Sequence, residues 1–118
     1  MELRLPTFLP VAWRGRPAVA AMEASGIPLM DELLWDTYGP DQEAKEPLYR
    51  SMFEGLQPGV AHFLIHPAWD VDQLDDLVGR ETRVADYRIF SSGGPGAQLA
   101  AAGVKLVDYR AIRAAIAR

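Results

Sequence analysis

The feature that most constrains this sequence is its density of residues that interrupt regular structure. Ten glycines and nine prolines are spread over 118 residues, somewhat above the usual share of these two residue types. Proline lacks the backbone donor that helices and ladders need, and glycine weakens the interior of both elements. The chain is therefore expected to fold as many short elements joined by turns, which excludes a bundle of long helices.

The hydrophobic pattern between these interruptions alternates between strand-like and helix-like segments. The expected strands are residues 3–11, 32–38, 60–66 and 104–107, and the expected helices are residues 17–25, 42–56, 80–90, 97–102 and 109–117. Strands that alternate with helices favour parallel βα units, as in an α/β layer or a barrel. Because 118 residues suffice for one domain with a core but not for two, residues 1–118 are interpreted as a single α/β domain.

Individual residues set the ends of three expected helices. Gly26 is placed to end the helix of residues 17–25. Pro47 is taken as the point where the helix of residues 42–56 begins in earnest, because proline suits a first helical turn. Asp108 is expected to cap the last helix through its side chain.

The composition excludes several classes of chemistry and of partner. The sequence has no cysteine, which excludes thiol catalysis, disulfides and cysteine-bound zinc. Its formal net charge of −4 has the wrong sign for gripping nucleic acid through overall charge. No apolar run approaches the roughly 18 residues of a membrane helix, and the first residues do not resemble a signal peptide. We expect no nucleic-acid partner, no membrane partner and a cytoplasmic location.

Residues 60–66 form the clearest expected strand, and this strand ends in a histidine followed by a proline. The segment is apolar on both faces, as a strand in a covered parallel sheet should be. His66 falls at its C-terminal end, where βα folds place catalytic groups, and Pro67 ends the ladder there. An imidazole at this rim suits general acid or base catalysis. The alternative is a histidine that only bonds a loop carbonyl, and spacing does not separate the two.

His62 and Asp70 lie on either side of His66 in the sequence. His62 precedes it by four residues, about 13 Å along an extended strand, so the two rings cannot bind one metal ion. His62 is expected to pack in the interior or to face a buried carboxylate. Asp70 follows His66 by four residues and is expected to turn back and orient its ring. The other aspartates of this loop lack the glycine and closing glutamate of a calcium loop.

Five segments, taken in order along the chain, resemble the YdjC-like (chitooligosaccharide deacetylase) family. Residues 59–70, GVAHFLIHPAWD, resemble its segment in which a His-Pro pair precedes a small residue, an aromatic residue and Asp. Residues 83–92, RVADYRIFSS, resemble one of its helices, with Asp86 where the family usually has Glu. The remaining matches are residues 4–6, 26–39 and 98–110.

This resemblance implies a distorted (β/α) barrel and a metal-dependent hydrolase that removes acetyl groups from N-acetylated sugars. The family binds a divalent metal, zinc or magnesium, through an Asp and two His in the first half of its chain, and the sequence shows no counterpart of that half. The chain is therefore expected to be the C-terminal half of such a deacetylase and to bind no metal alone. Its expected partners are an acetylated oligosaccharide and either a second copy or a missing N-terminal half.

The resemblance also implies roles for individual residues. A histidine at the position of His66 would protonate the leaving amine or stabilise the tetrahedral intermediate. Arg4 would orient a carboxylate or the substrate, with an exposed terminal arginine as the alternative. Arg83 and Asp86 stand three residues apart on one helix and are expected to form a structural ion pair. The expected catalytic residues are His66, Asp70 and Arg4, with no metal-binding or cofactor-binding residue.

Two other functions stay open from the sequence. A carbohydrate-binding or assembly module that keeps the fold without catalysis is the first. Another metal-dependent barrel hydrolase, such as a phosphoesterase, is the second, and it would need a cluster of acidic and histidine residues that the sequence does not show.

Overall fold

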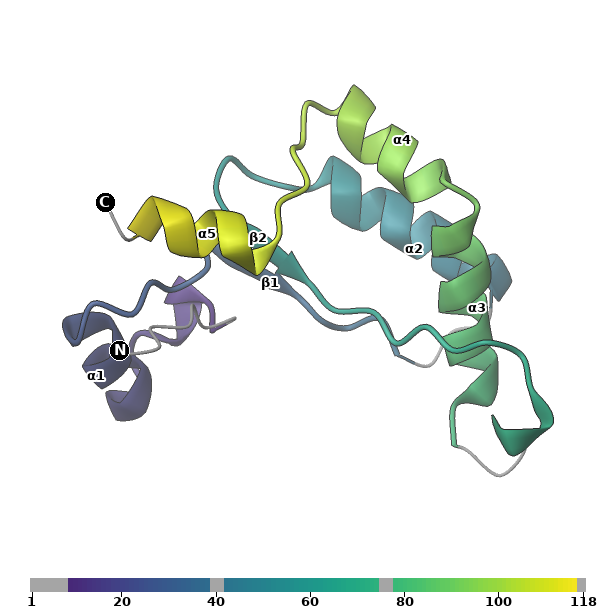
Figure 1. Ribbon diagram of the computed structural model, residues 1–118, viewed down its shortest axis with the longest axis horizontal. Helices are drawn as coiled ribbons and strands as arrows, with labels where there is room; N and C mark the ends of the chain where they lie inside the picture. Colours follow the sequence, from purple (N-terminus) through teal and green to yellow (C-terminus); the bar gives the residue numbers. More distant parts are fainter. Residues whose placement is uncertain (1–8, 39–41, 75–77, 117–118) are drawn as a thin grey trace. The chain divides into compact units, whose positions relative to one another are not determined.

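The computed structural model describes residues 9–38, 42–74 and 78–116. In chain order its elements are the short 3-10 helix η1 (Val11–Trp13), α1 (Pro17–Ala24), β1 (Glu32–Leu34), α2 (Gln42–Glu54), β2 (Ala61–Phe63), the 3-10 helix η2 (Asp72–Leu74), α3 (Arg80–Ser91), α4 (Gly94–Ala101) and α5 (Tyr109–Ile116) (Figure 1). The fold is mixed α/β and mostly helical, with a small parallel sheet. Among the described helices, none combines the length and the apolar character that a bilayer span requires.

The small sheet is built from parallel pairings, as the alternating sequence pattern predicts. β1 and β2 lie side by side. A separate parallel bridge joins Pro10 to Met30, just before β1. Met30 donates to the carbonyl of Leu9 at 3.0 Å and accepts from the N–H of Val11 at 2.8 Å. This bridge falls in the expected strand 3–11, most of which lies outside the described residues.

Each strand is shorter than the sequence predicts. β1 covers Glu32–Leu34 and β2 covers Ala61–Phe63, where residues 32–38 and 60–66 were expected. The prediction for residues 60–66 is therefore wrong in its second half. The N–H of Leu64 still donates to the carbonyl of Leu34 at 2.9 Å, and the N–H of His66 donates to the carboxylate of Asp86 on α3 at 2.8 Å, so the pairing with β1 ends after Leu64.

Residues 104–107 form no strand, which contradicts the prediction. The N–H of Val104 donates to the carbonyl of Leu99 at 2.9 Å, and that of Gly103 donates to Ala100 at 3.0 Å. These two bonds are the Schellman closure of a helix end, and Gly103 has the positive φ of 75° that this closure uses. The apolar side chain of Val104 packs on the core beside Leu99, so its burial serves α4 rather than a sheet.

The expected helices are present, with shifted ends. Gly26, at φ 81°, follows α1 as predicted. Asp108 caps α5 as predicted, since its carboxylate accepts from the N–H of Ala111 at 2.9 Å. α2 begins at Gln42, five residues before Pro47. The prediction that the helix begins in earnest at Pro47 is wrong. The turn before Pro47 is helical and carries Lys45, whose side chain is buried and bonds Asp86.

The main core lies among α2, α3 and α4, which contact one another (Figure 1). Its buried residues are Tyr49, Phe53, Ile89 and Leu99. Phe63 of β2 closes this core, with its ring centroid 5.5 Å from that of Tyr49 and 5.4 Å from that of Phe53. Both contacts are edge-to-face, the favoured arrangement of aromatic rings.

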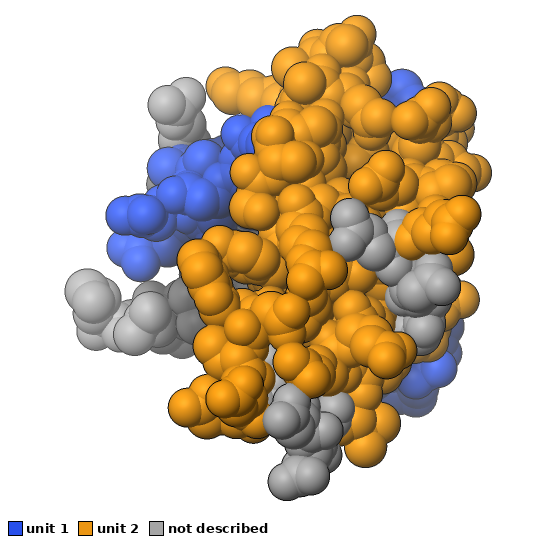
Figure 2. Space-filling model, turned by 90° about the vertical axis from the view of Figure 1, so that its right-hand side faces the viewer, with its two compact units in different colours: residues 1–33, 58–62, 106–118 blue, residues 34–57, 63–105 orange. Residues whose placement is uncertain are grey.

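The chain divides into two compact units, coloured separately in Figure 2. Unit 1 is residues 1–33, 58–62 and 106–118, and unit 2 is residues 34–57 and 63–105. The core described above belongs to unit 2, as do His66, Asp70 and Asp86. Unit 1 buries Val19 and Met30.

Candidate functional site

His66 lies three residues beyond β2 and is held at two points. Its backbone N–H donates to Oδ2 of Asp86, on α3, at 2.8 Å. Its ring stands edge-on to that of Tyr38, with centroids 5.5 Å apart and planes at 89°. The side chain is half-buried, so the imidazole packs against Tyr38 and is still reachable from solvent.

Asp86 belongs to a fully buried polar cluster with Lys45 and Tyr49 of α2. Nζ of Lys45 lies 2.5 Å from Oδ1 of Asp86 and 3.1 Å from Oη of Tyr49. The hydroxyl of Tyr49 donates to the same Oδ1. Burial raises the pKa of Tyr49, and its hydrogen bond to Asp86 acts in the same direction. Tyr49 is therefore a neutral donor, and Asp86 keeps its second oxygen for the backbone of His66.

A buried ion pair of this kind fixes geometry more than it adds stability. Removing two charges from water costs several kcal/mol per ion, and their attraction roughly offsets that cost only when geometry and hydrogen bonding are good. Lys45 and Asp86 have no exposed surface, and each has a second hydrogen-bond partner. The pair therefore ties α2, α3 and the segment after β2 to one another at the position of His66.

Asp70 does not meet the expectation that it orients His66, because two arginines of α3 take up its carboxylate. Arg80 donates to Oδ1 at 2.7 Å and Arg88 donates to Oδ2 at 3.0 Å. All three side chains are more than one-third exposed. Asp70 thus anchors the segment after His66 on the surface of α3.

Arg83 does not form the expected ion pair with Asp86, which pairs with Lys45 instead. The guanidinium of Arg83 lies over the ring of Tyr38, 5.7 Å from its centroid. Its Nε is buried and has no hydrogen-bond partner among the described residues. The ring of Tyr38 therefore contacts the Arg83 cation as well as the ring of His66.

The other predicted residues lie elsewhere. Arg4 is outside the described residues. His62 is in unit 1, where its Nδ1 is 2.7 Å from the hydroxyl of Tyr109 and burial lowers its pKa. His62 is half-buried, in partial agreement with the expected interior packing, and its ring bonds a phenol.

Sequence reasoning missed Lys45, Tyr49 and Tyr38. Lys45, Tyr49 and Phe53 recur every four residues, the spacing of one helix face, and this repeat is the signal that marks Lys45 as inward-facing. It is overlooked when the helix is started at Pro47. Tyr38 carries no such pattern, since its role depends on a contact with a distant segment.

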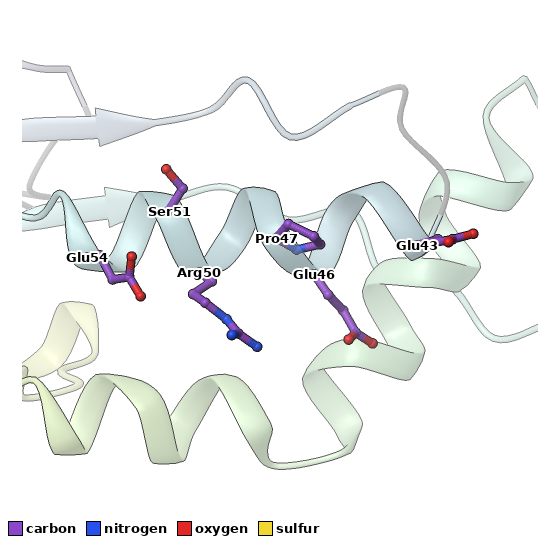
Figure 3. A pocket seen from close by; sticks show the side chains of 6 residues that line it. All are labelled: Glu43, Glu46, Pro47, Arg50, Ser51 and Glu54. Carbon is purple, nitrogen blue, oxygen red and sulfur yellow. The ribbon is translucent and has the colours of Figure 1, made fainter.

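A hollow of about 540 Å³ is lined by residues of α2. It is lined by Glu43, Glu46, Pro47, Arg50, Ser51 and Glu54, and Figure 3 shows Glu46, Arg50 and Glu54 projecting from one side of the helix. Its lining is charged and contains none of the predicted catalytic residues. The side chains that line it are exposed to solvent. We therefore place the candidate catalytic site at His66 and not in this hollow.

The part of the chain that the structure describes has no group of three or more His, Asp or Glu side chains able to share a metal ion. The described residues alone therefore do not fit the divalent metal that the resemblance implies. Comparison with protein-family models, with curated proteins and with solved structures found no match. Any function assigned to the chain thus depends on the residues around His66 and on the motif in which it lies.

Proposed function

We propose that this chain is the C-terminal portion of a YdjC-like carbohydrate deacetylase and that its strands belong to a distorted (β/α) barrel. The parallel pairing of β1 with β2 and the parallel bridge before β1 support the fold, since such barrels are built from successive parallel strands. The substrate is an N-acetylated oligosaccharide, and the reaction is hydrolysis of its acetamide bond.

The observation that supports this proposal most is the placement of His66 just beyond β2, with its backbone bonded to Asp86 and its ring against Tyr38. When water adds to the acetyl carbon and the C–N bond breaks, acetate leaves with the new oxygen and the amine nitrogen must gain a proton. A protonated imidazole supplies that proton as a general acid. Asp86 and Tyr38 hold His66 from the backbone and from the ring, as precise proton transfer requires.

Of the two steps of the reaction, only protonation of the leaving amine is assigned to the described residues. They do not fit a metal site on their own, so activation of the water is not assigned to them. Arg83 beside Tyr38 is a positioning residue in this scheme, because it supports the ring against which His66 packs.

The test is a single substitution in the product of the whole gene, including any coding sequence that precedes residue 1. His66→Ala should lower kcat for release of acetate from an N-acetylchitooligosaccharide by roughly 10²–10⁴-fold, the usual contribution of a positioned acid. Metal content, measured by mass spectrometry of the purified protein, should stay unchanged. His62→Ala, which removes the other histidine of the sequence, is the control and should leave kcat nearly unchanged.

Two results would contradict this role. A His66→Ala protein that loses its metal together with its activity would make His66 a metal ligand. A His66→Ala protein with full kcat would remove it from the reaction.

A further inference from the structure

Trp69, in the segment that follows His66, is exposed, and its ring packs against the half-buried Tyr87. Trp69 is 64% exposed, and its ring centroid lies 4.9 Å from that of Tyr87 on α3, with the planes at 51°. Trp69 therefore offers an open aromatic face, backed by Tyr87, close in the chain to His66.

The position of Trp69 is fixed from both sides. The N–H of Ala68 donates to the carbonyl of Arg83 at 3.1 Å. On the other side, Asp70 is held by Arg80 and Arg88. The backbone on either side of Trp69 is thus anchored to α3, and the indole itself packs against Tyr87, which reduces the freedom it would lose on binding.

Asp70 follows Trp69 in the chain, Arg88 follows Tyr87, and the two side chains bond each other at 3.0 Å. Asp70 is 43% exposed and Arg88 is 55% exposed, so a ligand can reach both. A carboxylate accepts up to about four hydrogen bonds, and a guanidinium carries five N–H donors. An apolar face with a few fixed donors and acceptors at its edge is the general composition of a small-molecule site.

We propose that Trp69 and Tyr87 form a platform for one pyranose unit of an oligosaccharide, with Asp70 and Arg88 bonding its hydroxyls. A pyranose ring has a face of C–H groups, which packs on an aromatic ring, and hydroxyls around its edge, which need donors and acceptors. Trp69 is only three residues beyond His66, at most about 11 Å of extended chain. This inference rests on the proposed function, because it names the surface that holds the substrate chain while one acetamide group reaches His66.

The test is a titration of this 118-residue chain with N-acetylchitotriose, followed by NMR and calorimetry. The sequence has three tryptophans, whose indole N–H signals report each site separately. The signal of Trp69 should shift with sugar, while those of Trp13 and Trp35 stay in place. Trp69→Ala should weaken binding about tenfold or more, a loss equivalent to about 1.4 kcal/mol.

Trp35→Ala is the matched control, because Trp35 is 60% exposed and so resembles Trp69 in exposure. Binding by this variant should equal that of the unaltered chain. Trp69→Phe keeps a ring at the position and should retain more affinity than Trp69→Ala. Since Trp69 is exposed, neither replacement at this position should impair folding, which circular dichroism checks.

Several results would overturn the platform. These are an unshifted Trp69 signal at millimolar sugar, equal losses from Trp69→Ala and Trp35→Ala, and a Trp69 signal that responds to single-stranded RNA in place of sugar. The assay reads binding and not acetate release, so it fails separately from the deacetylase proposal. Sugar binding at Trp69 without acetate release by the whole gene product would support the binding platform and contradict the deacetylase proposal.

Discussion

Lys45 and Asp86 form the buried ion pair that lies behind the backbone of His66. Their charges are 41 positions apart in the sequence and meet with no exposed surface. A lysine and an aspartate are normally read as surface residues, so local pattern alone could not have paired them. His66 was predicted because its signal is local, a strand end followed by proline. The residues that hold it come from α2, α3 and the segment after β1, and a single sequence does not reveal such distant contacts.

Lys45→Met tests the buried pair. The substitution leaves Asp86 buried without its cation, which typically costs roughly 3–5 kcal/mol of unfolding free energy. Chemical denaturation followed by circular dichroism measures the loss. Lys105→Met is the matched control, since Lys105 is exposed and is the only other lysine, and it should change stability by less than about 0.5 kcal/mol. Equal, small effects of the two substitutions would show that Lys45 is solvated.

His62 provides a test by pH. Burial lowers its pKa from the ordinary value of 6.5. As pH falls through 6.5, the unfolded chain therefore takes up the proton first, and stability falls until the lower folded pKa is reached. Titration by NMR should give a pKa for His62 below 6.5. Tyr109→Ala, which uncovers the ring, should return the pKa toward 6.5, and Tyr109→Phe should not. A pKa of the unaltered chain at or above 6.5 would contradict the burial of His62.

At the scale of elements, the sequence predicted helices better than strands. α3 and the cap of α5 were predicted because their signals, apolar spacing and an Asp before the first turn, are local. Residues 60–66 and 104–107 are apolar enough for strands. Their ends bond other partners instead. The backbone N–H of His66 donates to the side chain of Asp86, and the N–H of Val104 donates to Leu99 at the end of α4. An apolar segment is therefore expected to be buried, but its composition does not show which strand or helix it packs against.

Two glycines at helix starts provide a matched test of local structure. Gly79 precedes α3 with φ 79°, and a Cβ there would overlap the hydroxyl of Tyr38. Gly79→Ala should therefore destabilise the chain by roughly 1–2 kcal/mol, the cost of a left-handed conformation with a Cβ. Gly96 lies within α4 with open space around it, so Gly96→Ala should stabilise by about 0.4–1 kcal/mol. Thermal unfolding measures both, and shifts of the same sign would contradict this account.

At the scale of the whole molecule, we predict that the chain alone self-associates. Parallel strands with open edges pair readily with another chain, and within residues 9–38, 42–74 and 78–116 β1 and β2 make up a two-stranded sheet. Exposed apolar side chains add to this tendency, with Leu106 70% and Val107 51% exposed. A symmetric dimer is the commonest outcome. Light scattering at tens of micromolar protein measures the mass, and a stable monomer that unfolds cooperatively would contradict the prediction.

The measurement that bears most directly on the central claim is the product formed from an acetylated sugar. The protein from the whole gene, including any coding sequence before residue 1, is incubated with zinc or magnesium and an N-acetylchitooligosaccharide, and acetate and sugar are measured together. We predict release of acetate with the sugar chain left intact, and loss of that release in His66→Ala. Binding of the sugar without acetate, or hydrolysis of a phosphoester in place of the acetamide, would contradict it.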